Sequence, residues 1–147
     1  MSKISAGLLM YRIKAGEPEV FLVHPGGPFW KNKDVGVWSI PKGEIDGAED
    51  LLAAAEREFE EETAVKPSGP FSYLGTVERP GKIVHAWAFQ GDCDPAKIKS
   101  NTIMINWPPR SGKQLESPEV DRAGFFTLVE AKEKLIPYQL PLLENML

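Results

Sequence analysis

The sequence predicts a mixed α/β fold in which one β-sheet packs between helices. Three observations lead to this prediction. A chain of 147 residues suits one domain with a substantial core. Apolar, β-branched runs typical of strands lie on both sides of one helical segment. Strands and helices do not alternate regularly along the chain, which favours a mixed sheet over a regular parallel one.

Two strands are predicted at the start of the chain. Residues 4–13 and 19–24 are apolar and rich in strand-forming side chains, and the turn-like segment 14–18 joins them into a hairpin. The Pro/Gly-rich segment 25–36 reads as a loop, either a functional element or a plain connector. A short strand is predicted at 37–40, "VWSI".

One central helix and several later elements follow. Residues 50–63 place Leu51, Leu52, Ala55 and Phe59 at helical spacing. Strands are predicted at 71–77, 82–89 and 102–107. The segment "WPPRSGK" is either a loop that presents Arg110 and Lys113 to a phosphate or a plain hairpin connection. Thr127 and Glu130 have the spacing of a capping box, which predicts one or two C-terminal helices.

The charges are distributed unevenly along the chain. The net charge is −4, but residues 44–62 hold nine acids and one base, which leaves a net positive remainder. A focused negative segment suits a bound cation, whereas nucleic-acid recognition usually needs a basic stripe, so nucleic acid is not an expected partner. Cys93 is the only cysteine and the N-terminal apolar run is short, so we expect a cytoplasmic protein without a membrane span.

The acidic residues of the central helix predict a metal site. On a helical wheel Glu58, Glu61 and Glu62 fall within one arc of about 100° beside the apolar side, whereas Glu56 and Glu60 point away. Like charges at this spacing cost roughly 0.2–0.5 kcal/mol per pair. Magnesium or manganese would offset that cost, and magnesium commonly shares its coordination with substrate phosphates. The alternative is a solvated acidic helix without a metal.

The spacing of this segment resembles a known motif. In "PKGEIDGAEDLLAAAEREFEEETAV" the residues that resemble the Nudix box, G-x5-E-x7-R-E-U-x-E-E-x-G-U, are Gly43, Glu49, Arg57, Glu58, Phe59, Glu61, Glu62 and Val65. The resemblance to the Nudix hydrolases implies a single domain over residues 1–147 with their α/β/α sandwich. Ala64 replaces the second glycine of the motif. We expect a slightly altered turn there, with activity retained.

The resemblance also implies roles for individual residues. Glu58, Glu61 and Glu62 would bind Mg²⁺, or Mn²⁺ in its place, and the Gly43 carbonyl would be a further ligand. Arg57 and Glu49 would form an orienting pair, completing the predicted catalytic set. The general base would be Glu61 or Glu62, or else a distal acid, Glu116 or Glu119.

The implied activity is hydrolysis of a phosphoanhydride in a nucleoside diphosphate-linked substrate. Dinucleoside polyphosphates and nucleoside triphosphates are the first candidates, with ADP-ribose or a nucleotide sugar as alternatives. Lys42, Arg79 and Arg110 are predicted phosphate contacts. Trp38 is a candidate base contact, because "VWSIPKGEID" is similar to the entry segment of diadenosine-polyphosphate hydrolases. A non-catalytic Nudix-fold module that binds a nucleotide or a protein is the competing prediction, and the oligomeric state stays open.

Overall fold

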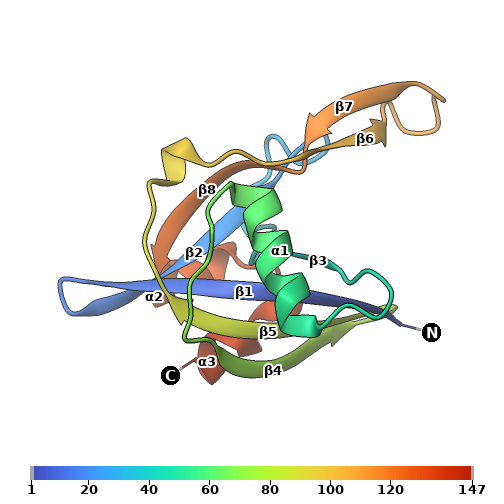
Figure 1. The fold of residues 1–147 in the computed structure, drawn as a ribbon. Helices are drawn as coiled ribbons and strands as arrows, with labels where there is room; N and C mark the ends of the chain where they lie inside the picture. Colours follow the sequence, from blue (N-terminus) through green and yellow to red (C-terminus); the bar gives the residue numbers. More distant parts are fainter. Residues whose placement is uncertain (1, 147) are drawn as a thin grey trace.

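The computed structural model describes residues 2–146 and contains eight strands within that range (Figure 1). The strands span Lys3–Lys14 (β1), Glu17–Pro25 (β2), Lys42–Glu44 (β3), Ser72–Arg79 (β4), Lys82–Gln90 (β5), Thr102–Asn106 (β6), Gln114–Pro118 (β7) and Val120–Thr127 (β8). The helices span Leu51–Thr63 (α1), Leu128–Lys134 (α2) and Pro141–Asn145 (α3). Short 3₁₀ turns lie at Pro95–Lys97 (η1) and Pro137–Gln139 (η2).

The main sheet is mixed, as predicted. Its strand order is β4-β5-β1-β2-β8, and β3 pairs with β1 at one end. β1 runs parallel to β5, whereas its pairings with β2 and β3 are antiparallel. The predicted N-terminal hairpin is therefore confirmed, and β1 is the central strand on which the other strands assemble.

Helices cover both faces of this sheet. Successive side chains of a strand point to opposite faces, so β1 contributes to two cores. Leu8 and Met10 join Phe59 of α1 in one core, whereas Leu9 joins Leu142 of α3 in the other. Figure 1 shows α1 on one side of the sheet, with α2 and α3 on the other. The predicted α/β/α sandwich is confirmed.

Helix α1 has defined caps at both ends. The Asp50 carboxylate accepts a hydrogen bond from the Ala53 N–H at 3.0 Å. At the other end Ala64 has φ 63° and ψ 17°, and its N–H donates to the Glu60 carbonyl at 2.7 Å. Ala64 thus adopts the left-handed conformation that a glycine favours, at a cost of roughly 1–2 kcal/mol. The altered turn expected from the sequence is replaced by a left-handed cap that carries this strain.

Some predicted elements differ from the structure. Residues 37–40 were predicted as a strand, but they make only isolated bridges, Val23 with Ser39 and Trp38 with Leu135. The strand β3 forms just after them instead, at a polar sequence that has no strand pattern of its own. Strands β7 and β8 were also not predicted. β7 is polar and mostly exposed, and β8 carries the charged and small residues 121–124 before its two phenylalanines.

The later strands and the C-terminal helices agree with the sequence-based predictions. β4, β5 and β6 lie where strands were predicted. The capping box at the start of α2 is present, with Thr127 and Glu130 bonded reciprocally. Among residues 2–146 there is no helix with the length and apolar character needed to cross a membrane, and the cytoplasmic location stays a prediction.

Strands β6 and β7 form a separate two-stranded ribbon, here called the arm. The segment "WPPRSGK" connects them, which confirms that it is a hairpin connection. Figure 1 shows the arm extending away from the main sheet, near the end of α1 at which Glu62 lies. The chain between β7 and β8 then returns to the body at Glu119.

Candidate active site

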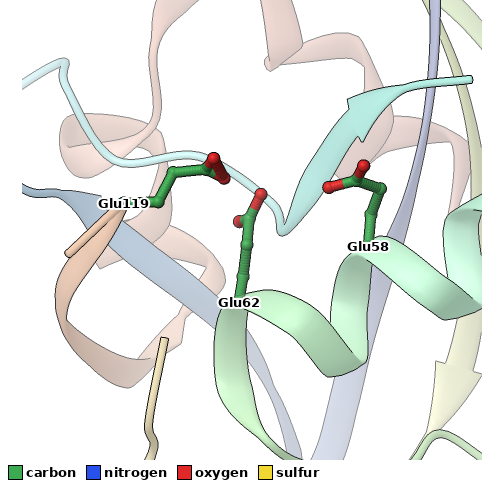
Figure 2. Close-up of side chains that lie close together, drawn as sticks. All are labelled: Glu58, Glu62 and Glu119. Carbon is green, nitrogen blue, oxygen red and sulfur yellow. The ribbon is translucent and has the colours of Figure 1, made fainter. Parts of the chain in front are cut away.

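Three carboxylates meet at the C-terminal half of α1. Glu58 and Glu62 lie one turn apart on the helix, and Glu119 joins them from the junction of β7 and β8 (Figure 2). One oxygen of each carboxylate lies within 4.8 Å of the others. Glu58 and Glu62 are buried and Glu119 is half-buried. We call these three residues the acid cluster.

The backbone fixes the position of Glu119. Its N–H donates to the Asn101 carbonyl at 3.0 Å, and its carbonyl accepts from the Gly26 N–H at 2.9 Å. These bonds tie the chain between β7 and β8 to two other loops. A residue 57 positions after Glu62 in the sequence is thereby held at the acid end of α1.

The acid cluster is electrostatically costly without a counter-ion. Burial raises the pKa of Glu58, and the nearby Glu61 carboxylate adds to the effect although Arg57 opposes it. Burial raises the pKa of Glu62 well above its usual range, with a further contribution from Glu119 and opposition from Lys42. Buried carboxylates need a compensating charge, and hard oxygen ligands suit Mg²⁺ or Mn²⁺. The donor set therefore fits a divalent cation.

Gly43 has a steric role beside this cluster. It pairs with Ala6 in the β3–β1 ladder, and the Glu58 carboxylate lies against its Cα. A Cβ at this position would lie 2.1 Å from Glu58 Oε2, closer than any real contact. A glycine is therefore required for Glu58 to reach its place. The Gly43 carbonyl as a metal ligand stays a prediction.

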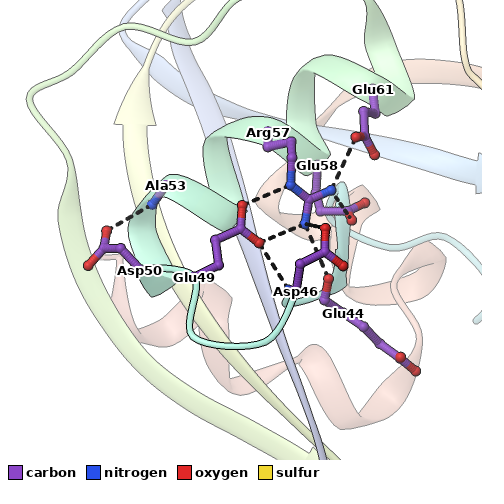
Figure 3. A network of polar contacts seen from close by, with 8 residues as sticks. All are labelled: Glu44, Asp46, Glu49, Asp50, Ala53, Arg57, Glu58 and Glu61. Carbon is purple, nitrogen blue, oxygen red and sulfur yellow. Dashed lines mark hydrogen bonds and ion pairs between the residues drawn. The ribbon is translucent and has the colours of Figure 1, made fainter.

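The predicted pair Arg57 and Glu49 is in contact (Figure 3). Arg57 Nε and Nη2 each donate to a Glu49 carboxylate oxygen at 2.9 Å. Arg57 Nη1 donates to Glu58 at 2.9 Å, and Nη2 donates to the Glu44 carbonyl at 3.3 Å. The bonds to Arg57 lower the pKa of Glu49 to about 2. Arg57 therefore links α1, the preceding loop and the acid cluster.

Glu61 occupies a different position from the other box acids. It was expected to converge with Glu58 and Glu62, but its half-exposed side chain accepts a hydrogen bond from Arg57 Nη1 at 3.1 Å. Four residues separate the two, the spacing of a helical ion pair. The structure thus places Glu119, rather than Glu61, in the third position of the cluster. Metal binding by Glu61 stays a prediction.

Two cavities adjoin the acid cluster. The first has a volume of about 200 Å³ and is lined by Glu62, Glu119 and Lys42. The second, of about 230 Å³, shares Lys42 and Ser39 with the first, and we call it the aromatic cavity. It is lined by Trp30 and by Tyr138, whose ring lies 4.9 Å from the Arg79 guanidinium carbon. Lys42 and Arg79 therefore line one cavity, and Lys42 also lines the cavity that contains Glu62 and Glu119.

The other predicted substrate contacts lie elsewhere. Trp38 is buried, and its indole N–H donates to Asp34, so it lines neither cavity. Arg110 is exposed in the turn at the tip of the arm, and Glu116 is exposed on β7. Tyr138 was not singled out from the sequence, because only the folding of η2 against residues 38–40 brings it to the cavity. No local pattern marks it.

Comparison with known proteins defines the family. The NUDIX domain family matches residues 1–146. The chain therefore belongs to the NUDIX domain family. The enzymes of this family are Nudix pyrophosphohydrolases. Among curated proteins, no sequence matches the chain significantly.

Several solved structures share the fold. A binary complex of Ap4A hydrolase from C. elegans superimposes with a TM-score of 0.66 at 23% identity, covering 98% of this chain and 94% of that one. The NUDIX domain of Shewanella oneidensis NrtR, complexed with ADP ribose, gives 0.65 at 20% identity, covering 99% and 86%. The C-terminal domain of mouse MUTYH in complex with human PCNA gives 0.62 at 16% identity, covering 99% and 88%.

The acid cluster predicts that Glu62→Gln stabilises the metal-free protein. A carboxyl whose pKa is raised by folding keeps its proton in the folded state, so stability falls as the pH rises above about 4.3. Removing the charge should increase the free energy of unfolding at pH 7.5 by roughly 0.5–2 kcal/mol. Urea denaturation in chelator between pH 4.5 and 8 measures the difference.

Glu60→Gln is the matched control, because Glu60 is an exposed glutamate on the same helix. It should change the stability by less than about 0.5 kcal/mol. A Glu62→Gln protein that is less stable than the parent throughout this pH range would contradict the electrostatic account.

Proposed function

We propose that this protein is a divalent-metal-dependent hydrolase that cleaves a phosphoanhydride bond in a nucleoside diphosphate-linked substrate. The observation that carries the proposal is the acid cluster, which opens into the same cavity as the Lys42 ammonium group. Carboxylates for a metal and a cation for phosphate stand on either side of one small space. Such an arrangement suits transfer of a phosphoryl group to water.

The proposed mechanism assigns a task to each group. Glu58, Glu62 and Glu119 would hold the Mg²⁺ or Mn²⁺ ion, with Glu61 and the Gly43 carbonyl as further proposed ligands. When bound, the ion supplies charge neutralisation for the phosphates and lowers the pKa of a nearby water. Arg57 would hold Glu58 and Glu61 in place through its bonds to both. Lys42 would bind and orient a phosphate.

The position of each acid reduces the number of candidates for the general base. Glu116 is exposed on the arm, paired opposite Met104, and lies outside the acid cluster. Proton abstraction requires hydrogen-bonding reach to the attacking water. The position of Glu116 therefore favours Glu61, Glu62 or Glu119 as the base.

The aromatic cavity supports a nucleoside as part of the substrate. Trp30 and Tyr138 offer aromatic faces for a base, and Arg79 and Lys42 offer cations for the adjoining phosphates. The fold is shared with an Ap4A hydrolase and with a NUDIX domain complexed with ADP ribose. We place dinucleoside polyphosphates first and nucleoside triphosphates second, with ADP-ribose and nucleotide sugars behind them. A small-molecule nucleotide is the proposed partner.

A non-catalytic module is the second candidate. A solved structure with this fold is a complex between two proteins, mouse MUTYH and human PCNA. The acid cluster favours the enzyme, because a module that binds only a partner does not need three carboxylates gathered beside a cavity.

Hydrolysis of a substrate panel tests the proposed function. We expect magnesium-dependent turnover of at least one of diadenosine tetraphosphate, the nucleoside triphosphates, ADP-ribose and a nucleotide sugar, resolved by anion-exchange chromatography. Glu62→Gln should lower kcat about 100-fold or more, because one metal ligand is lost. Glu60→Gln should retain activity within about twofold. No turnover with either magnesium or manganese would favour the non-catalytic module.

The two predicted arginines provide a test of the cavity. Arg79→Gln should raise KM for the nucleotide substrate about tenfold, because one charge-assisted contact to a phosphate is lost. Arg110→Gln, at the tip of the arm, should leave KM within about twofold. Steady-state kinetics of both purified variants measures the effect. Equal effects of the two substitutions would contradict the assignment of the aromatic cavity to the substrate.

A further inference from the structure

An apolar groove separates the arm from the loop that follows β2. Its volume is about 310 Å³, at the lower end of the range for small-molecule sites. The loop wall carries Phe29 and Trp30, whose rings pack edge to face with centroids 4.7 Å apart. The arm wall carries Ile103, Ile105 and Trp107. We call this space the arm groove.

The arm has one apolar and one polar face. Residues directly opposite in an antiparallel pair share a face, and faces alternate along each strand. One face therefore carries the apolar side chains of Ile103, Ile105 and Leu115. The other face carries Met104 with the polar residues Gln114 and Glu116, whereas Asn106, at the end of β6, also lines the groove. Ile105 lies near Gly27, 3.4 Å from the position of a Cβ there, so the apolar face is turned toward the loop.

Both walls of the groove remain uncovered. Phe29 is 53% exposed, and Ile103 and Leu115 are each 41% exposed. A two-stranded ribbon is only marginally stable in water unless its apolar face packs against something. The apolar surfaces of the loop and the arm therefore face each other across a space that a ligand would fill.

The two walls are held at a fixed separation. The Gly26 N–H donates to the Glu119 carbonyl, and a Cβ on Gly26 would lie 2.0 Å from the Pro118 carbonyl oxygen. Only glycine permits this approach of the loop to the end of β7. The fold thus fixes the loop wall against the base of the arm.

The groove is continuous with the candidate active site. Trp30 lines both the arm groove and the aromatic cavity. Gly26, which lines the groove, is hydrogen-bonded to the backbone of Glu119 in the acid cluster. A molecule with two planar groups joined by a polyphosphate could therefore occupy the cavity and the groove together, with its phosphates near the acids.

We infer that the arm groove binds the second nucleoside of a dinucleoside polyphosphate. This inference rests on the proposed function and specifies its substrate class. The nucleobase of this second nucleoside lies between Phe29 and the aliphatic side chains of the arm. Any nucleobase can stack in this way, because each has a planar face. The Lys33 ammonium, 3.8 Å from the centroid of the Phe29 ring, adds a positive charge beside the groove.

Binding to two ligands that differ in the second nucleoside tests the inference. Isothermal titration of the wild-type protein with magnesium compares uncleavable, methylene-bridged analogues of diadenosine tetraphosphate and adenosine tetraphosphate. We expect the diadenosine tetraphosphate analogue to bind about tenfold more tightly, because stacking of one additional base increases the affinity by about this factor. Adding Phe29→Ala or Ile103→Ala should reduce this ratio of Kd values to near one. Met104→Ala, on the polar face of the same ribbon, should preserve it.

The alternative outcomes separate the inference from the proposed function. A ratio near one in the parent protein, or a ratio kept in both groove variants, overturns the inference and leaves the hydrolase intact. If neither ligand binds and the wild-type protein hydrolyses no nucleotide, the proposed function fails and the inference with it. A dimer in sedimentation velocity that Phe29→Ala dissociates would assign the groove to a second copy and also overturn the inference.

Discussion

The burial of two carboxylates on α1 is the constraint on which the rest of the site depends. Glu58 and Glu62 lie on the side of the helix that faces the sheet, where water cannot hydrate them fully. Each surrounding feature reduces or uses that cost. Arg57 bonds to Glu58, and Lys42 lowers the pKa of Glu62 against the effect of burial. A divalent ion would complete the neutralisation, and a site that binds one would lower the stability of the metal-free protein.

The local part of this site was predictable from the sequence. Gly43, Glu49, Arg57 and the box glutamates lie within one loop and one helix, so their spacing along the chain fixes their positions. The spacing alone did not show that Glu61 turns to Arg57. The orientation of the Glu61 side chain depends on its ion pair with Arg57, and a helical wheel does not represent ion pairs.

The distant parts of the site required the fold. Glu119 was only one of two distal candidates, and the bonds of its backbone to Gly26 and Asn101 bring it to the cluster. Tyr138 reaches the aromatic cavity because η2 packs on residues 38–40. β3 and β8 were missed for a related reason, since pairing with neighbouring strands holds them. β3 is short and polar, and the apolar residues of β8 are separated by the charged and small residues 121–124.

The end of β2 and the loop after it line all three cavities of this region. Pro25, the last residue of β2, lines both cavities near the acids, and the loop contributes Gly26 and Phe29 to the arm groove and Trp30 to the groove and the aromatic cavity. The sequence left this loop open between a functional element and a connector. Its position between the acid cluster and the arm favours the functional interpretation.

The manganese affinity of a Glu119→Gln protein shows whether the acid cluster binds a divalent metal. Titration followed by electron paramagnetic resonance measures free Mn²⁺ without any nucleotide, with Glu116→Gln as the control from the same segment. The account predicts that Glu119→Gln weakens binding about tenfold or more, whereas Glu116→Gln leaves it unchanged. Equal affinity of the Glu119→Gln and parent proteins would contradict the acid cluster as the metal site.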